Sequence, residues 1–181
     1  MLFELLLKYV ETFSFLNVFK YITFRTGLAV FTSLILVLII GGPFIEMVSK
    51  KKIINPIRND GPGDHIIKKI GTPTMGGLVI LIGIILSVLM WSDLTNIYIL
   101  FSLYILISFG LLGFLDDYKK IKNNNSSGVS FKFKLFSQII LSIIGISFLT
   151  YVSEYQELKN LYFPFFKDLF INLGWFFIPF S

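Results

Sequence analysis

The chain has 181 residues, of which 55% are hydrophobic, and it contains no cysteine. Its mean hydropathy of +0.78 excludes a soluble domain of ordinary composition. The lack of cysteine excludes a disulfide framework and a thiolate metal site. The net charge is +5, but the basic residues are grouped between apolar runs. We interpret these groups as membrane-flanking loops and expect no nucleic-acid partner.

The N-terminal residues predict a short amphipathic helix that lies at the outer surface of a membrane. Their apolar side chains recur near helical spacing, at Phe3, Leu6, Leu7, Val10 and Phe13. Charged residues interrupt this run, so one face of the helix is polar, as in helices that lie along a membrane interface. The alternative is that these residues simply extend the first membrane span.

Four uncharged runs follow, and each is close to the roughly 20 residues that a helix needs to cross a bilayer. The runs are Thr26–Ile45, Ile70–Ser92, Leu94–Leu115 and Leu135–Ser153. We therefore predict an all-α membrane protein, a single domain over residues 1–181, with spans at about 24–47, 73–92, 95–116 and 134–153. The alternative, four buried helices of a soluble protein, requires a large polar shell that this chain lacks.

The charges between the spans predict the orientation in the membrane. The segment from Glu46 to Lys69 carries six Lys/Arg against three acids, and the segment from Asp116 to Lys134 carries five against two. Basic loops stay on the cytoplasmic side of a membrane. Cytoplasmic loops are therefore predicted at 48–72 and 117–133, and the N-terminus, the short link at Asp93 and residues 154–181 are predicted outside.

The last segment, from residue 154 onward, is rich in aromatic residues. Pro164 and Pro179 argue against one continuous helix. The last uncharged run, Leu169–Ser181, is too short to span a bilayer. Aromatic residues favour both β-strands and the lipid interface. We therefore predict a small β-hairpin on the outer face of the membrane.

The stretch "KKIGTPTMGG", Lys68 to Gly77, predicts the start of the second span. Thr72 can cap a helix, and Pro73 suits its first turn. A helix start offers free N–H groups and a positive dipole end, which suit a phosphate, and the two lysines place cations beside it. The alternative is a well-capped helix whose glycines serve packing against a neighbour.

The stretch "GFLDDYKK", Gly113 to Lys120, places two adjacent acids where the third span ends. By the alternation of spans, Asp116 and Asp117 share a membrane face with the start of the second span. Adjacent helical residues point about 100° apart, so we expect the two acids to have different roles, such as holding a divalent cation and handling a proton. The alternative is a pair of acids that marks a helix end and is neutralised by nearby lysines.

These features together indicate phosphoryl transfer. One membrane face gathers a helix start that suits a phosphate, a carboxylate pair and many lysines. Phosphoryl transfer needs cations to spread charge, a metal ion and carboxylates to position it. A lipid phosphate at the level of the headgroups is the substrate that such a location favours.

The residues also resemble a known family. "PIRNDGPGDHIIKKIGTPTMGG", "GFLDDYKK" and "GVSFKFKLFSQ" closely resemble the phospho-N-acetylmuramoyl-pentapeptide transferase (MraY) family, and "YITFRTGLAV" fits its first span. The resemblance implies transfer of phospho-MurNAc-pentapeptide from UDP-MurNAc-pentapeptide to undecaprenyl phosphate, which gives lipid I and UMP in peptidoglycan biosynthesis. It also implies Mg²⁺ as cofactor, a bacterial inner membrane with a cytoplasmic active face, and a homodimer.

The same resemblance assigns roles residue by residue. It implies catalytic roles for Asp116, Asp117 and Lys69, and substrate-binding roles for Thr74, Lys120, Lys132 and His65. It places a metal at Asp116 or Asp117, although the main metal ligand of the family, a later Asp, is absent from these 181 residues. The alternative for His65 is a histidine in a loop that is simply solvated.

The chain departs from the family in its number of spans. The family has about ten, against four predicted here, and its later Asn/Asp motif and histidine cluster are absent from these residues. We therefore expect an N-terminal part of the enzyme that is inactive alone. Two other readings stay open: a related polyprenyl-phosphate HexNAc-1-phosphate transferase acting on another UDP-sugar, and a non-catalytic membrane fragment. The "GTPTMGG" element favours the first assignment over the related transferase.

Overall fold

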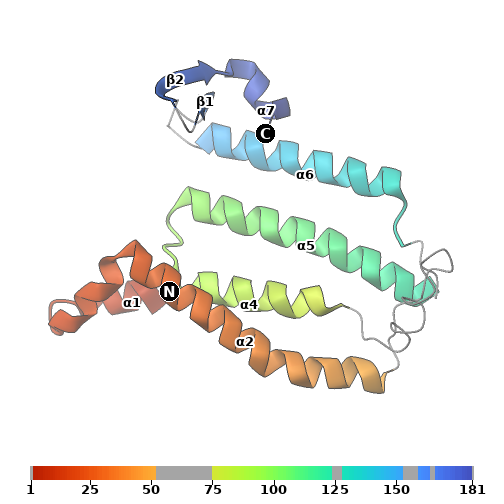
Figure 1. Ribbon diagram of the computed structural model, residues 1–181, viewed down its shortest axis with the longest axis horizontal. Helices are drawn as coiled ribbons and strands as arrows, with labels where there is room; N and C mark the ends of the chain where they lie inside the picture. The colour runs from red at the N-terminus through yellow and green to blue at the C-terminus, as the bar shows by residue number, and fades with distance from the viewer. Residues whose placement is uncertain (1, 52–74, 124–127, 153–158, 164–165, 181) are drawn as a thin grey trace.

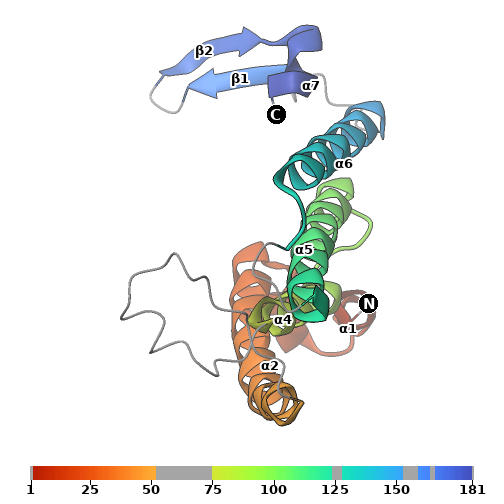
Figure 2. The same cartoon turned by 90° about the vertical axis from the view of Figure 1, so that its right-hand side faces the viewer.

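The computed structural model describes residues 2–51, 75–123, 128–152, 159–163 and 166–180. Its longest elements are the helices α2 (Ile22–Lys50), α4 (Gly76–Trp91), α5 (Ile97–Asn123) and α6 (Phe131–Val152). They run back and forth, and each packs against the next along the chain (Figure 1). Figure 2 shows that they form a row rather than a closed bundle. The start of α4, the end of α5 and the start of α6 therefore lie on the same side of the row, where the helices begin or end.

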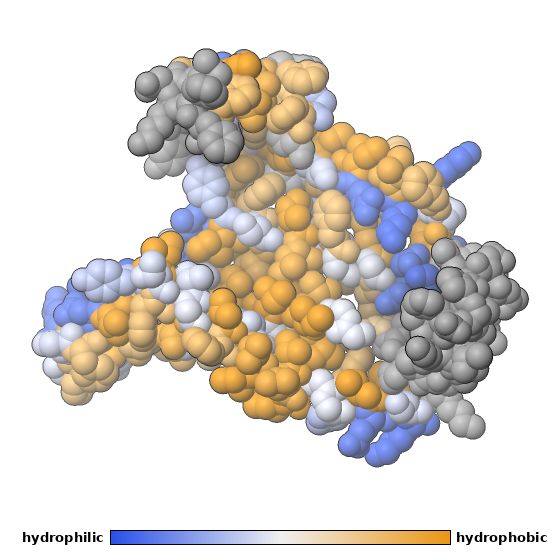
Figure 3. All heavy atoms as spheres, in the orientation of Figure 1, coloured by the Kyte–Doolittle hydropathy of each residue, from blue (hydrophilic) through white to orange (hydrophobic). Residues whose placement is uncertain are grey.

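Three of these helices, α2, α5 and α6, are long and apolar enough to cross a membrane. The described part of α4 is equally apolar but has 16 residues, or about 24 Å at the usual helical rise. Only 0%, 6% and 17% of the most apolar windows of α2, α5 and α6 are buried within the structure. Hydrophobic side chains cover the flanks of the helices, as Figure 3 shows. The predicted class, a multi-pass helical membrane protein, is confirmed.

Small and hydroxylated residues set the contact between α2 and α4. Ser87 is only 2% exposed, and its hydroxyl donates to the Ala29 carbonyl at 2.5 Å and lies 2.9 Å from the Thr32 hydroxyl. One turn away, a Cβ on Gly83 would lie 2.7 Å from Val37 Cγ2. Where lipid surrounds helices, small residues allow the close approach that drives association. This pair of helices is therefore closely fitted over two successive turns of α4.

Glycines also fix the contacts on both sides of α5. A Cβ on Gly110 would lie 2.6 Å from Leu81 Cδ1 of α4, and one on Gly145 of α6 would lie 2.8 Å from Tyr104 Cε1. The Tyr104 hydroxyl donates to the Leu141 carbonyl at 3.1 Å, which adds a polar tie between α5 and α6. These contacts hold α5 close to both of its neighbours, and the Gly110–Leu81 contact lies at the cavity itself.

The N-terminal segment forms two short helices, α1 (Leu2–Lys8) and η1 (Ser14–Lys20). Tyr21 is extended between η1 and α2, with φ −77° and ψ 124°, so the alternative that these residues extend the first span is wrong. Phe3 is buried, and its ring centroid lies 4.1 Å from the guanidinium carbon of Arg25. The segment is thus a separate element that packs against the beginning of α2. Its position at the outer surface of the membrane stays a prediction.

The predicted hairpin is present after α6. Strands β1 (Asn160–Phe163) and β2 (Phe166–Asn172) pair antiparallel, with Asn160 opposite Asn172. Their side chains are also joined, because the Asn172 amide donates to Asn160 Oδ1 at 2.8 Å. The short helices η3 (Gly174–Phe176) and α7 (Phe177–Phe180) follow. Figure 1 shows the hairpin near the end of the helices opposite to the C-terminal end of α5.

Candidate active site

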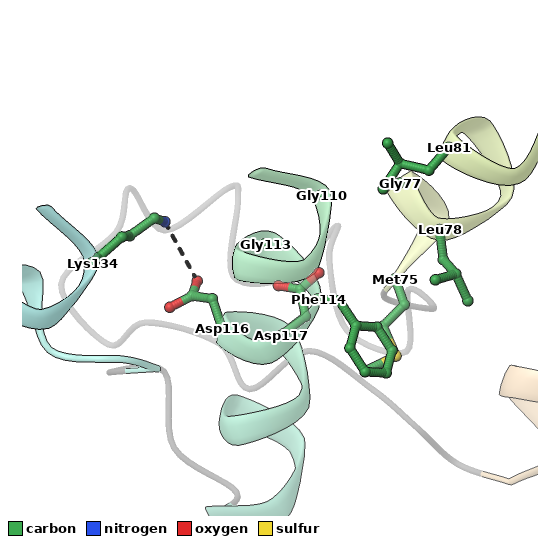
Figure 4. A pocket seen from close by; sticks show the side chains of 10 residues that line it. All are labelled: Met75, Gly77, Leu78, Leu81, Gly110, Gly113, Phe114, Asp116, Asp117 and Lys134. Atoms are coloured by element: carbon green, nitrogen blue, oxygen red, sulfur yellow. Dashed lines mark ion pairs between the residues drawn. The ribbon is translucent and has the colours of Figure 1, made fainter. Parts of the chain in front are cut away.

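A cavity of about 370 Å³ opens where α4 begins, α5 ends and α6 begins. Figure 4 shows how its lining residues come from these three helices. The lining residues are Met75, Gly77, Leu78, Leu81, Gly110, Gly113, Phe114, Asp116, Asp117 and Lys134. The cavity wall formed by α4 and by residues 110–114 of α5 is apolar. The charged groups, Asp116, Asp117 and Lys134, lie together near the end of α5. This division suits a ligand with an apolar part and an anionic head.

Helix α4 begins at Gly76, three residues later than the Pro73 start that the sequence predicts. The reason is Met75, which precedes the helix in a left-handed conformation with φ 70°. Thr72 and Pro73 lie outside the described residues, so a cap at Thr72 is not seen. A Cβ added to Gly76 or Gly77 would meet nothing within 4 Å. The first turn of α4 therefore has open space beside it, on the side of the cavity.

Helix α5 continues to Asn123, so the acidic pair lies within the helix rather than at its last residues. The two side chains leave the helix in different directions, as the angle of about 100° per residue requires. The Asp116 side chain is 14% exposed and that of Asp117 is 34% exposed. In Figure 4, Asp116 lies toward Lys134 of α6, and the carboxylate of Asp117 lies nearer the beginning of α4.

Asp116 has partners on both carboxylate oxygens. Its Oδ1 accepts a hydrogen bond from the backbone N–H of Val129 at 2.9 Å. Its Oδ2 lies 2.7 Å from Lys120 Nζ and 3.9 Å from Lys134 Nζ. Charge-assisted hydrogen bonds of this length are among the stronger polar contacts in proteins. Asp116 therefore ties the end of α5 to the turn before α6 and to α6 itself.

Asp117 is less constrained. Among the described residues its one ion pair joins Oδ1 to Lys120 Nζ at 3.5 Å, a longer contact than the Asp116–Lys120 pair. Lys120 thus lies between the two carboxylates and is itself mostly buried, with 23% of its side chain exposed. Asp116 and Asp117 balance Lys120 and Lys134 in formal charge. An anionic ligand and a divalent cation can therefore enter this neutral cluster together.

Two comparisons with known proteins lead to the same family name. The signature described as "Phospho-N-acetylmuramoyl-pentapeptide-transferase signature 1" covers residues 69–81. Curated relatives named phospho-N-acetylmuramoyl-pentapeptide-transferase align along the whole chain, at 63% identity in Pelagibacter ubique and 43% in Thermodesulfovibrio yellowstonii. The relative in Borrelia turicatae is 43% identical over 92% of the chain.

The chain matches the N-terminal part of the phospho-N-acetylmuramoyl-pentapeptide-transferases. It spans about half the length of the curated relatives, covering 50%, 50% and 47% of the three named above. The signature includes Met75, Gly77, Leu78 and Leu81, which form the α4 wall of the cavity. The described part of the signature, residues 75–81, therefore lines the same cavity as the acidic pair.

The structure brings together some of the predicted site residues. Asp116, Asp117 and Lys120 form one cluster. Lys132, in the first turn of α6, is exposed and forms no ion pair within the described part of the chain. Lys69, Thr74 and His65 lie outside the described residues, so the roles predicted for them stay predictions.

Two parts of the site are not predicted from the sequence. Lys134, rather than Lys132, lies beside Asp116, and the Gly128–Val129 turn supplies the N–H that Asp116 accepts. Both belong to "GVSFKFKLFSQ", which resembles the transferase family as a whole stretch. Lysines two positions apart on a helix point in nearly opposite directions. The segment could therefore be singled out, but not which of its lysines faces α5.

The carboxylates fit a divalent metal only in part. Within the described ranges, no group of three or more His, Cys, Asp and Glu could hold an ion. Mg²⁺ usually takes one or two carboxylates together with waters and substrate phosphates rather than a complete protein cage. Asp117, which is the more exposed acid and lines the cavity, can supply such a carboxylate. This chain therefore offers one of the oxygen ligands that a divalent metal needs, and waters or a bound phosphate would have to supply the others.

Proposed function

We propose that this chain forms half of an active site that transfers phospho-MurNAc-pentapeptide from UDP-MurNAc-pentapeptide to undecaprenyl phosphate. The observation that carries the proposal is the cavity in which signature residues of α4 face Asp116 and Asp117 of α5. Its charged end suits a diphosphate and a lipid phosphate, and its apolar wall suits the lipid chain that follows. The products are lipid I and UMP, in peptidoglycan synthesis.

The bond changes define what the site must do. A phosphate oxygen of undecaprenyl phosphate attacks the β-phosphorus of the UDP-sugar, and the bond from that phosphorus to the UMP oxygen breaks. Negative charge then builds on the UMP phosphate, and two anionic substrates must approach each other. Lys134, at the cavity, and Lys120, beside the two acids, offset this charge. Lys69, Thr74, Lys132 and His65 remain proposed contributors from the same membrane face.

Mg²⁺ is the metal that we propose for the site, with Asp117 as its carboxylate on this chain. When bound, it would neutralise the diphosphate and stabilise the leaving UMP. The chain's own residues hold the geometry: α4 and α5 form the wall, and the lysines fix the anions. A second half of the site is expected from the part of the relatives that this chain does not match. We also propose that the active face is cytoplasmic, in the inner membrane, and that the enzyme is a homodimer.

A related HexNAc-1-phosphate transferase is the second candidate. It needs the same acidic pair, but the signature at residues 69–81 favours the phospho-MurNAc-pentapeptide substrate. Both candidates use a UDP-sugar and a polyprenyl phosphate, so they differ only in the sugar that is accepted. An assay that offers both UDP-MurNAc-pentapeptide and UDP-N-acetylglucosamine separates them.

The test uses a chimera in which residues 1–181 are joined to the half of the Pelagibacter ubique relative that they do not match. Purified chimera is mixed with undecaprenyl phosphate, Mg²⁺ and either UDP-sugar, and UMP release is followed. We expect release with UDP-MurNAc-pentapeptide and none with UDP-N-acetylglucosamine. The relative itself serves as the positive control. An inactive chimera beside an active relative would contradict the proposal.

The 181 residues assayed without a second half are expected to release no UMP. One carboxylate pair is a poor Mg²⁺ cage, because this ion relies on several oxygens. Loss of a single group that stabilises developing charge already costs on the order of 100-fold to 1,000-fold in rate. Turnover by the 181 residues alone would show that the described cluster is more complete than we propose.

A further inference from the structure

We propose that Asp116 is a positioning residue rather than a catalytic one, and that Asp117 is the carboxylate that meets the metal–diphosphate. Asp116 and the Gly128–Val129 turn together hold Lys120 and Lys134 at the edge of the cavity. This inference rests on the proposed function and divides the work between two adjacent acids. It also makes Gly128, a residue outside the signature, a determinant of the site.

The contacts of Asp116 leave it little capacity for a metal. Val129 N–H occupies Oδ1 at 2.9 Å, and Lys120 Nζ occupies Oδ2 at 2.7 Å. A second ammonium, from Lys134, lies 3.9 Å from the same Oδ2. A divalent cation approaching Asp116 would therefore meet two positive charges at short range, and like charges repel most strongly away from bulk water. The carboxylate instead orders the two lysines.

Gly128 shows how closely the turn fits around this carboxylate. It has a left-handed φ of +55°, and a Cβ on it would lie 2.5 Å from Asp116 Oδ1 and 2.9 Å from Lys120 Cε. Any side chain would therefore strain the backbone and push against both groups. Only two residues separate Gly128 from the first residue of α6, Phe131. Through this turn, Asp116 sets where α6 starts and hence where Lys134 points.

Asp117 has the opposite surroundings. It lines the cavity with 34% of its side chain exposed, and its Oδ1 is 3.5 Å from Lys120 Nζ. Figure 4 places its carboxylate on the side of α5 that faces the beginning of α4, away from Lys134. The signature residues Met75 and Gly77 lie on that side. A metal bound to a substrate diphosphate there would meet one carboxylate and the open first turn of α4.

The decisive measurement is Mn²⁺ binding to the chimera with UMP present, followed by electron paramagnetic resonance, which does not depend on turnover. We expect Asp117→Asn to weaken Mn²⁺ binding at least about 10-fold, whereas Asp116→Asn changes it less than about 3-fold. Asparagine keeps the size of aspartate and can still accept the Val129 N–H, so both variants are expected to fold. Equal or greater weakening by Asp116→Asn, or no weakening by Asp117→Asn, would overturn the assignment.

Kinetics test the positioning role. Asp116→Asn should raise the KM for UDP-MurNAc-pentapeptide more than it lowers kcat, with the Mg²⁺ requirement unchanged. Gly128→Ala must displace its neighbours by roughly an ångström to restore ordinary contact, and such a shift can cost on the order of 100-fold in rate. The matched control is Gly42→Ala in α2, where a Cβ meets nothing within 4 Å, and it should behave as wild type. Gly128→Ala at wild-type KM and kcat would contradict the role of the turn.

The two proposals fail in different ways. A chimera that releases no UMP but shows the Mn²⁺ pattern expected for the two variants would refute the proposed function and retain the division between the acids. A chimera that makes lipid I but loses Mn²⁺ binding through Asp116→Asn would keep the function and refute the division.

Discussion

The helices α2, α4, α5 and α6 are held together by different chemistry at their two ends. At the end where α4 stops, the Phe19 ring stacks on Trp91 with centroids 5.8 Å apart, and Phe3 covers the Arg25 guanidinium at 4.1 Å. At the opposite end, ion pairs around Asp116 surround a cavity of about 370 Å³. Stacked rings close a surface, whereas ion pairs can be exchanged for a charged ligand. Within the described residues, we therefore expect chemistry at the charged end and not at the aromatic end.

The largest expected effect concerns the membrane orientation of these two ends: we expect the charged end to face the cytoplasm and the aromatic end to lie outside. Single cysteines are introduced at Lys50 and at Asn96, in a chain that has no cysteine of its own. Lys50 ends α2 at the charged end, and Asn96 precedes α5 at the aromatic end. An impermeant thiol reagent added to intact cells should label the Asn96 site fully and the Lys50 site not at all. The reverse pattern would place the charged end outside.

The next effect concerns activity. Asp117→Asn in the chimera should lower lipid I synthesis by about 100-fold to 1,000-fold, because it removes a charge aimed at the reacting phosphates. The matched change at the aromatic end is Asp93→Asn. Hydrogen bonds from the Thr95 hydroxyl and backbone N–H lower the pKa of Asp93, and this acid lies in the link between α4 and α5. Transfer of radiolabel into lipid should be normal for Asp93→Asn, and a comparable loss in both variants would remove the distinction between the ends.

A smaller effect, on stability, is expected at the contact between α2 and α4. Gly83→Ala places a Cβ 2.7 Å from Val37 Cγ2 and 3.2 Å from the Ser33 carbonyl oxygen. The side chain can turn away, but the backbone oxygen cannot, so α2 and α4 must separate at a cost of about 1–3 kcal/mol. Thermal unfolding in detergent measures the loss. Gly41→Ala, which has open space, should show little change, and equal destabilisation of both variants would argue against close helix contact as the cause.

The smallest effect is expected at Ser87. Ser87→Ala removes the hydroxyl that donates to Ala29 and contacts Thr32, although Thr32 keeps its own bond to the Ala29 carbonyl at 3.1 Å. Hydrogen bonds between membrane helices average about 0.6 kcal/mol, and a loss of this size is expected in the same unfolding measurement. Ser102→Ala, which removes only a local bond to Tyr98, is the control. A loss above about 2 kcal/mol would contradict the small contribution expected for this hydroxyl.

The apolar runs and the aromatic tail were sufficient to predict the main elements. A run of about 20 uncharged residues must form a helix in lipid, because each backbone N–H and C=O needs an internal partner there. Prolines and aromatic residues in the tail predict a break from helix, and the pairing of Asn160 with Asn172 confirms the hairpin. The alternation of spans also placed Asp116 and Asp117 at the same end as the start of α4.

Three features were decided only by tertiary structure. The start of α4 at Gly76 depends on the left-handed Met75, although its neighbours Thr72 and Pro73 would both suit an earlier start. The choice of Lys134 over Lys132 depends on how α6 is rotated against α5, which Gly145 and Tyr104 fix. Gly128 lies against the Asp116 carboxylate although the two residues are 12 positions apart in the sequence. Local composition sets helices and strands, but rotation and spacing between helices come from packing, so only the folded chain shows which charges meet.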